Sequence, residues 1–393
     1  MTKRFIHVAA LVCSILAVTA HACLWDRDTL ATEARGLPGI TEIITGRFDR
    51  FPPLFYEMRL ERVTGELADD PDNLDLYDDA GVACDRLGLS DEAIGWMERK
   101  LVVMDRLEAK GIDVSEHRYR YLANLGTFYV HRWLKNGASR EDMADVERSR
   151  DLIAAAIELN PEAHFGRERY QLLAIKSLLL SDSERSEMTS FLGVISPKAR
   201  QLSNYPDGTL LELGYADAAE GISGLIQLGS AWQSIEVYRA LEYALASEGH
   251  GVLSMLAHLR VHELTEIQYR LDPSAPKPVE LQDCEFPDIV SRYDAASLHD
   301  EFYIDARTEA DAWTHDRNNY LTARLLDGRH PDTDPKFWSN WKETSSPPKL
   351  PDSSIWPVIF IGLGVIIVFA LVVATFVVVV LKIIQFTRNA LSA

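Results

Sequence analysis

Two histidines and a glutamate stand at helical intervals in one stretch of the chain. His258, His262 and Glu266 are separated by four residues each, which would place all three on one face of a helix. Imidazole nitrogens and carboxylate oxygens are ligands that zinc uses. The zinc metalloprotease motif with this histidine spacing needs a glutamate after its first histidine to activate water, and Leu259 stands there. We therefore predict no metal and no cofactor; a metal-dependent envelope hydrolase built on these three residues is the alternative function.

The other arrangements that could support catalysis are incomplete. The segment Gly221-Ile222-Ser223-Gly224 lacks the glycine spacing of a nucleophile elbow, and no glycine-rich loop ends in Lys-Ser or Lys-Thr. Asp70-Pro71-Asp72 lacks the glycine and the terminal glutamate of a calcium loop. The acidic clusters at 299–301 and 332–334 are typical of solvated surface. We predict that the protein is not an enzyme.

Helices are the elements that must position all of these residues. Ser90 is predicted to cap a helix that Gly111 ends, and Ser139 with Asp142 signals the start of a helix that closes at Asn160-Pro161. Between about 181 and 208 we expect an irregular connection with one short helix. Apolar residues recur at helical spacing in further stretches near 54–67, 77–84, 119–133, 165–180, 221–245, 252–270 and 305–326.

Two of the helix pairs share a pattern of small and large residues. One carries Leu122-x2-Leu125-Gly126-x2-Tyr129, followed in its second helix by Ile153-x2-Ala156 and Leu159-Asn160-Pro161. The other carries Tyr77-x2-Ala80-Gly81-x2-Cys84 in its first helix. Because glycine has no side chain, Gly81 and Gly126 are predicted to mark the closest approach of the helices in each pair.

This pattern resembles the tetratricopeptide-repeat superfamily, with repeats near 73–107, 119–161 and 215–248. Cys23–Leu30, Gly46–Arg50 and Leu76–Cys84 are in addition similar to segments of exported, uncharacterised bacterial repeat proteins. The resemblance implies an all-α fold in which a short, irregular α-solenoid covers about 53–330.

In that superfamily the first helix of each pair lines an inner groove that binds peptides. A solvated helix face without a ligand is the alternative interpretation of the same positions. The resemblance places ligand-facing residues at Asp75, Asp78, Val82 and Asp85 in the first repeat, and at Arg120, Thr127 and His131 in the second.

Both ends of the chain carry targeting signals. Lys3-Arg4, an apolar run and Ala20-His21-Ala22 predict a signal peptide over 1–22, cleaved before Cys23, with lipidation of Cys23 as a second option. The 27 residues from Ile355 to Leu381 carry no charge. As a helix they would be about 40 Å long, whereas the hydrocarbon core of a bilayer is about 30 Å thick.

These signals predict a single-pass protein of the cell membrane. The body would lie outside the cytoplasm, in the periplasm or at the cell exterior, and residues 382–393 would form a cytoplasmic tail. An N-terminal extension over 23–52 would precede the helical domain, and a linker over 331–354 would connect that domain to the transmembrane helix.

The exported body is strongly acidic. It holds all 59 acidic residues and 36 of the 40 basic ones, so its formal charge is −23. A body of this charge repels phosphate backbones, which disfavours nucleic acid as a partner and favours a basic protein or peptide. Solubility of an exported protein would explain the same acidity.

Three cysteines remain after removal of the signal peptide. We predict a disulfide between Cys23 and Cys84, because it would fasten the N-terminal segment to the first repeat; three unpaired thiols, including Cys284, are the alternative. Taken together, the sequence predicts a membrane-anchored scaffold of the cell envelope that binds a protein or peptide partner.

Overall fold

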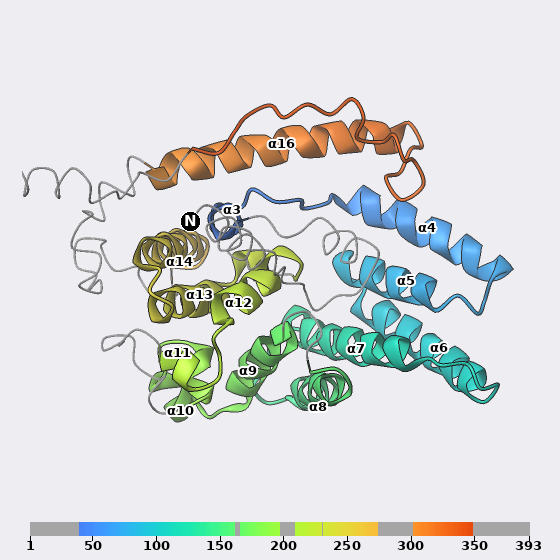
Figure 1. The fold of residues 1–393 in the computed structure, drawn as a ribbon, viewed down its shortest axis with the longest axis horizontal. Helices are drawn as coiled ribbons and strands as arrows, with labels where there is room; N and C mark the ends of the chain where they lie inside the picture. Colours follow the sequence, from blue (N-terminus) through green and yellow to red (C-terminus); the bar gives the residue numbers. More distant parts are fainter. Residues whose placement is uncertain (1–38, 162–165, 197–208, 230, 274–301, 349–393) are drawn as a thin grey trace, which may run out of the picture. The chain divides into compact units, whose positions relative to one another are not determined.

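Helices form every regular element in the described part of the chain (Figure 1). The computed structural model describes residues 39–161, 166–196, 209–229, 231–273 and 302–348. The all-α fold class is therefore confirmed for these residues. In chain order the elements are α3 (Ile40–Thr45), α4 (Pro53–Asp69), α5 (Leu74–Arg86), α6 (Ser90–Glu108), α7 (Ser115–Lys135), α8 (Ala144–Leu159), α9 (Arg167–Leu179), α10 (Asp182–Ser186), the 3-10 helix η2 (Phe191–Val194), α11 (Thr209–Glu212), α12 (Ala218–Gln227), the 3-10 helix η5 (Ala231–Gln233), α13 (Ile235–Ser247), α14 (Gly251–Leu271) and α16 (Ile304–Leu326).

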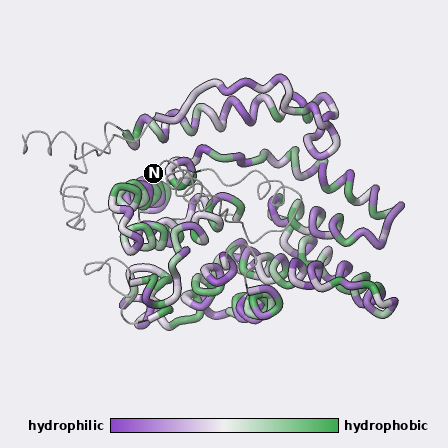
Figure 2. The backbone as a smooth tube through the Cα atoms, in the orientation of Figure 1, coloured by the Kyte–Doolittle hydropathy of each residue, from purple (hydrophilic) through white to green (hydrophobic). Residues whose placement is uncertain are grey.

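The spacing of apolar residues in the sequence predicts the bounds of three of these helices well. The helices expected over 54–67, 252–270 and 305–326 are α4, α14 and α16, and each boundary falls within two residues of its expected place. Figure 2 shows hydrophobic and hydrophilic residues alternating along the helices, as one-sided burial requires. The predicted cap at Ser90 is wrong by one position, because Ser90 is the first helical residue and Leu89 holds the cap position.

Helices α5 to α8 pack as two successive pairs. α5 lies against α6 and α7 lies against α8, while α5 also contacts α7. A Cβ added to Gly81 of α5 would lie 2.8 Å from Met97 Cε of α6, and one added to Gly126 of α7 would lie 2.9 Å from Ile153 of α8. Both glycines therefore lie in tight contact with the second helix of their pair, where an added side chain would force a neighbour to shift.

The second half continues this order of contacts. α8 packs on α9, α9 contacts α12, and α12, α13 and α14 follow one another. Between α9 and α12 the chain passes through the short helices α10, η2 and α11. The third pair, α12 with α13, is therefore separated from the first two by irregular structure and by α9.

Residues 39–50, which we expected to belong to an N-terminal extension, are built into the helical domain. α3 contacts α12, α14 and α16, and the side chains of Ile43 and Ile44 are buried. The segment lies far from these helices in sequence, so no local pattern indicates its position. Hydrophobic burial and a polar network together hold it there.

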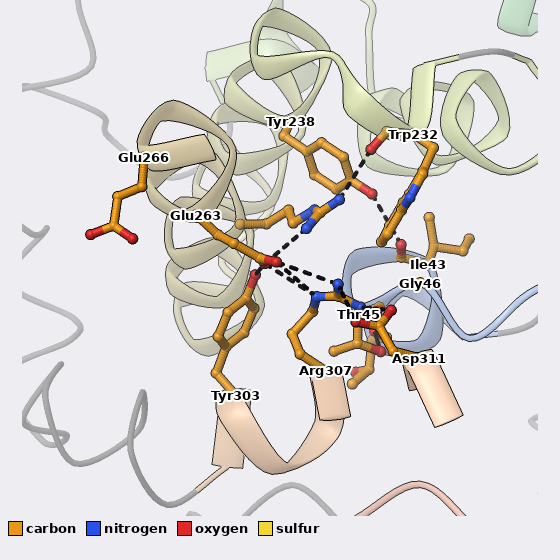
Figure 3. A network of polar contacts seen from close by, with 12 residues as sticks. Ile43, Thr45, Gly46, Trp232, Tyr238, Glu263, Glu266, Tyr303, Arg307 and Asp311 are labelled. Carbon is orange, nitrogen blue, oxygen red and sulfur yellow. Dashed lines mark hydrogen bonds and ion pairs between the residues drawn. The ribbon is translucent and has the colours of Figure 1, made fainter. Parts of the chain in front are cut away.

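The polar network binds three backbone carbonyl groups at the end of α3 (Figure 3). The hydroxyl group of Tyr238 donates to the carbonyl oxygen of Ile43 at 3.2 Å. Arg307 donates to the carbonyl oxygen of Thr45 at 2.6 Å, and Arg50 donates to that of Gly46 at 2.8 Å. These carbonyl groups lie at a helix C-terminus, where the backbone is electronegative, so guanidinium donors suit them.

Glu263 of α14 is the anion at the centre of this network (Figure 3). It forms ion pairs with Arg260 at 2.8 Å and Arg307 at 3.1 Å, and it accepts a hydrogen bond from Tyr303 at 2.5 Å. Burial by itself would raise the pKa of Glu263, but the two guanidinium groups lower it overall. Arg260 also stacks on the ring of Trp232, with 3.9 Å between its Cζ atom and the ring centroid.

The first part of the segment that we expected to be a linker, 331–348, packs on the helical domain instead. Asp332, expected on a solvated surface, is buried and accepts two hydrogen bonds from Arg59 of α4, at 2.7 and 2.9 Å. Phe337 is buried, and Trp338 stacks on Tyr320 of α16 with 5.6 Å between the ring centroids. The carboxylate of Asp332 is buried here because Arg59 and Arg62 of α4 neutralise it.

Several predictions concern residues outside the described ranges. These are the signal peptide over 1–22, the transmembrane helix over 355–381 and the tail over 382–393. Among the described helices, none combines the length and the apolar character that a membrane crossing needs. Cys84 is a free thiol and is 1% exposed; its predicted disulfide partner Cys23 lies outside the described residues.

Candidate functional site

A cavity of about 770 Å³ lies beside the first helix of the second pair. Helix α7 contributes one wall through Thr127, Val130, His131 and Leu134. The opposite walls come from α9, from the segment between α10 and η2, and from the region that joins α12 to α13. This volume falls in the range of ligand pockets, which is about 300–1,000 Å³.

The cavity exists because the succession of helix pairs is interrupted between α8 and α12. If the third pair followed α8 directly, its helices would pack closely on the second pair. Instead α9 and the short elements α10 and η2 separate them, and the space between α7 and α13 is only partly filled. Arg86 at the end of α5 crosses to the other side and donates hydrogen bonds to the carbonyl oxygens of Leu228 and Gly229, after α12.

One side chain in the cavity wall has an unused acceptor. Gln171 of α9 is 8% exposed, and its amide nitrogen donates to the hydroxyl oxygen of Thr127 at 2.9 Å. The hydroxyl group of Thr127 in turn donates to the carbonyl oxygen of Ala123 at 2.8 Å. Gln171 Oε1 is buried and has no hydrogen-bond partner among the described residues, an arrangement that costs about 1–3 kcal/mol.

His131 is the second polar group on this wall, one helical turn after Thr127. Its Nδ1 atom lies 2.9 and 3.0 Å from the two carboxylate oxygens of Asp85, whose side chain is buried. A carboxylate accepts and does not donate, so Nδ1 carries the proton. The Nε2 atom is thereby left for a ligand, and in this tautomer it is an acceptor.

A buried ion pair joins the two helices of the first pair, α5 and α6. Lys100 of α6 donates to Asp78 of α5 at 2.5 Å, and Asn124 of α7 donates to the other oxygen of this carboxylate at 3.1 Å. Asp78 is 1% exposed and Lys100 is 0% exposed. Burial raises the pKa of Asp78 to about 6, although Lys100 opposes that change, and burial lowers the pKa of Lys100.

A partly exposed extension of this cluster contains Asp75, His117 and Arg120. Arg120 forms an ion pair with Asp75 at 2.7 Å, and the Nδ1 atom of His117 lies 4.0 Å from the same carboxylate. Burial lowers the pKa of His117 to about 4, with the positive charge of Lys100 as the second cause. The local environment therefore disfavours a charged imidazole.

Ligand atoms of Asp75, Asp78 and His117 lie within 4.8 Å of one another. This spacing would suit a metal ion, but the ammonium group of Lys100 already contacts Asp78 at 2.5 Å. A divalent cation would have to displace that ammonium group or share the carboxylate with it. The protein thus supplies its own cation at this position.

The helical histidines singled out from the sequence are held differently. His258 Nδ1 lies 3.0 Å from Glu242 of α13, and His262 Nδ1 lies 3.9 Å from Glu266. In the described ranges the cluster at Asp75 is the one group of three such residues whose ligand atoms converge. His258, His262 and Glu266 therefore lie on one helix without forming a common ligand set there.

The structure divides the seven predicted groove residues into three groups. Thr127 and His131 line the cavity. Asp75, Asp85 and Arg120 are engaged in ion pairs. Asp78 and Val82 cannot face a ligand in this arrangement, because α5 is enclosed by α4, α6 and α7 and both residues are 1% exposed.

The charged groove positions of the two repeats also pair with one another in the described residues. The acids of α5 do not present a negative surface opposite a positive one, because Asp75 pairs with Arg120 and Asp85 pairs with His131. Sequence reasoning missed Gln171 and His117. For Gln171 no signal was available, because its role depends on α9 packing beside α7.

The comparisons with protein-family models, curated proteins and solved structures give no match to this chain. The described residues define an all-α protein with two glycine-centred helix pairs and a cavity next to the second pair.

Proposed function

We propose that the protein is a helical-repeat scaffold of the tetratricopeptide type, anchored in the cell membrane, that binds a segment of a protein partner outside the cytoplasm. The observation that carries this proposal is the cavity beside α7, with Thr127 and His131 in its wall. These are two of the positions that the repeat resemblance assigns to the ligand-facing side.

The packing of α5 to α8 supports the repeat part of the proposal. Each pair has a glycine in its first helix that faces the second helix, at Gly81 and Gly126. The first helices of consecutive pairs, α5 and α7, also contact one another. Stacking of this kind turns the first helices toward one side, which is where repeat proteins bind their ligands.

The lining of the cavity supports a peptide as the ligand. Apolar side chains such as Val130, Ile175 and Phe191 would receive an apolar side chain of the partner. The rim carries two acids and two arginines, so it favours neither sign of charge strongly. These rim residues are Asp182, Glu236, Arg185 and Arg239.

The anchor and the location rest on the sequence. The residues at 1–22 have the pattern of a signal peptide, and those at 355–381 have that of a transmembrane helix. The acidic charge of the body favours a partner whose flanking residues are basic. Protease added to spheroplasts should then digest the body; a body that resists protease until the cells are lysed would contradict this location.

Crosslinking in intact cells tests the binding function. Ala174→Trp on α9 would fill the cavity, whereas Val102→Trp introduces the same side chain at a position of α6 that is 70% exposed. We expect the wild-type chain and Val102→Trp to yield the same crosslinked partner, and Ala174→Trp to lose it. Identical crosslinked products from all three chains would contradict binding in the cavity.

A further inference from the structure

The polar groups of the cavity specify what its ligand must offer. Gln171 Oε1 is a buried acceptor without a partner in the described residues. His131 Nδ1 donates a hydrogen bond to Asp85, so in that tautomer the Nε2 atom is a second acceptor. Two acceptors surrounded by apolar side chains favour a ligand with neutral N–H groups, since a hydrated cation would lose more solvation on entering such a lining.

The helical rise between the two α7 positions that anchor these acceptors is close to the repeat of an extended peptide backbone. Gln171 is fixed to Thr127 by a hydrogen bond of 2.9 Å, and His131 follows Thr127 by four residues on α7. Four residues of an α-helix rise by about 6 Å. In an extended chain, N–H groups that point to the same side belong to residues i and i+2 and are separated by about 7 Å.

From this match we infer that the cavity binds an extended segment of the partner through its backbone. The N–H groups of residues i and i+2 donate to Gln171 Oε1 and His131 Nε2. The apolar side chain of one of these residues, or of the residue between them, fills the space lined by Val130, Ile175 and Phe191. This inference rests on the proposed peptide-binding function and adds how the peptide is recognised.

The protein also holds one of its own segments through hydrogen bonds between side chains and backbone groups. The end of α3 is held by side chains that reach its backbone carbonyl groups, including Tyr238 and Arg307 (Figure 3). Recognition of a backbone by side chains is therefore already used within this fold. At α3 the side chains are donors, whereas the two groups in the cavity are acceptors, so the cavity would contact the opposite set of backbone groups.

A peptide selection followed by backbone methylation tests the inference. A phage-displayed random dodecapeptide library would be selected on the full chain in detergent, and the peptides that Ala174→Trp fails to bind would be synthesised. Each would then be made with a single N-methylated amide at every position in turn. We expect methylation at two positions, i and i+2, to weaken binding to the wild-type chain about tenfold each.

Variants of the two acceptors identify which amide group each one contacts. Gln171→Leu keeps a similar volume and removes the acceptor, so methylation at one of the two positions should have no further effect on its binding. His131→Phe should remove the effect of methylation at the other position. The melting temperature of each variant serves as the control for folding.

The outcomes separate the two proposals. If peptides bind in the cavity but methylation is harmless everywhere, or costs the same in the wild-type chain and both variants, the backbone contact is refuted while peptide binding stands. If no selected peptide distinguishes the wild-type chain from Ala174→Trp, or if native mass spectrometry finds a small molecule that occupies the cavity, both proposals fail.

Discussion

The buried pair of Lys100 and Asp78 gives the sharpest test of the packing described above. Lys100→Met keeps a long side chain in place and removes the ammonium group that contacts the carboxylate at 2.5 Å. Both side chains are at most 2% exposed, so solvent does not screen the loss. Removing one partner of a buried pair costs about 3–5 kcal/mol, because the other charge stays buried without compensation.

The pH dependence of this cost has a definite sign. With Lys100 present, burial already raises the pKa of Asp78 to about 6 from an ordinary 3.8, and removal of the opposing charge raises it further. An acid whose pKa is higher in the folded state contributes stability at low pH, and that stability is lost as the pH rises through the folded pKa. The deficit of Lys100→Met should therefore be smaller at pH 4.5 than at pH 8, by about 2–3 kcal/mol.

Urea unfolding followed by circular dichroism, at both pH values, measures these quantities. The double variant Asp78→Leu with Lys100→Met should recover most of the loss, because an apolar pair of similar size replaces a buried ion pair at little cost. Arg118→Met removes one partner of an exposed ion pair with Asp105 and should cost less than about 1 kcal/mol. A deficit that is absent at pH 8, or equal at both pH values, would show that the carboxylate is not buried as described.

Two matched pairs of glycine substitutions and one labelling experiment test other contacts. Gly46→Ala should destabilise the protein by about 2–3 kcal/mol in the same unfolding assay, because the φ of Gly46 is +87° and a Cβ there would lie 2.2 Å from the ring of Trp232. Gly111→Ala is the control: its φ is +80° but no atom lies within 4 Å, so it should cost only about 1 kcal/mol. Gly126→Ala should destabilise the protein by about 1–3 kcal/mol, because the added methyl group would collide with α8. Gly65→Ala on α4, with open space around it, should stabilise the protein by up to about 1 kcal/mol. If the two substitutions changed the free energy of unfolding equally, the close contact of α7 with α8 would be contradicted. Burial raises the pKa of Cys84 to about 11, so iodoacetamide at pH 8 should label it only after unfolding, and rapid labelling of the native protein would refute its burial.

Local patterns in the sequence were sufficient for the helices and for the contacts within each pair. Spacing of apolar residues located α4, α14 and α16, and the missing side chains of Gly81 and Gly126 indicated where helices meet. Such signals lie within one helix or between sequence neighbours. They could not reveal the docking of α3 onto α12, α14 and α16, because those contacts join distant parts of the chain.

The same limit explains the errors about charged residues. Asp332 looked like a solvated acid because its partners, Arg59 and Arg62, precede it by about 270 residues. Asp78 looked like a groove residue because its place in the repeat gives no information about a lysine at position 100 that neutralises it. A carboxylate with a buried cation beside it belongs to the interior, and only the tertiary structure places the two together.

The cavity likewise depends on the irregular elements between the helix pairs, from α9 to α11, and not on the pairs themselves. In a regular stack each first helix is covered by the next pair, and a residue such as His131 would pack against it. Here the chain from α9 to η2 intervenes, and Arg86 holds α5 to the end of α12 across the gap. Arg86 therefore connects the two sides, but no side chain fills the space between them. The side chains of α7 that regular stacking would cover, such as His131, line the cavity instead. This is why the irregular spacing of the helix pairs bears more directly on the proposed binding than the shared geometry within each pair does.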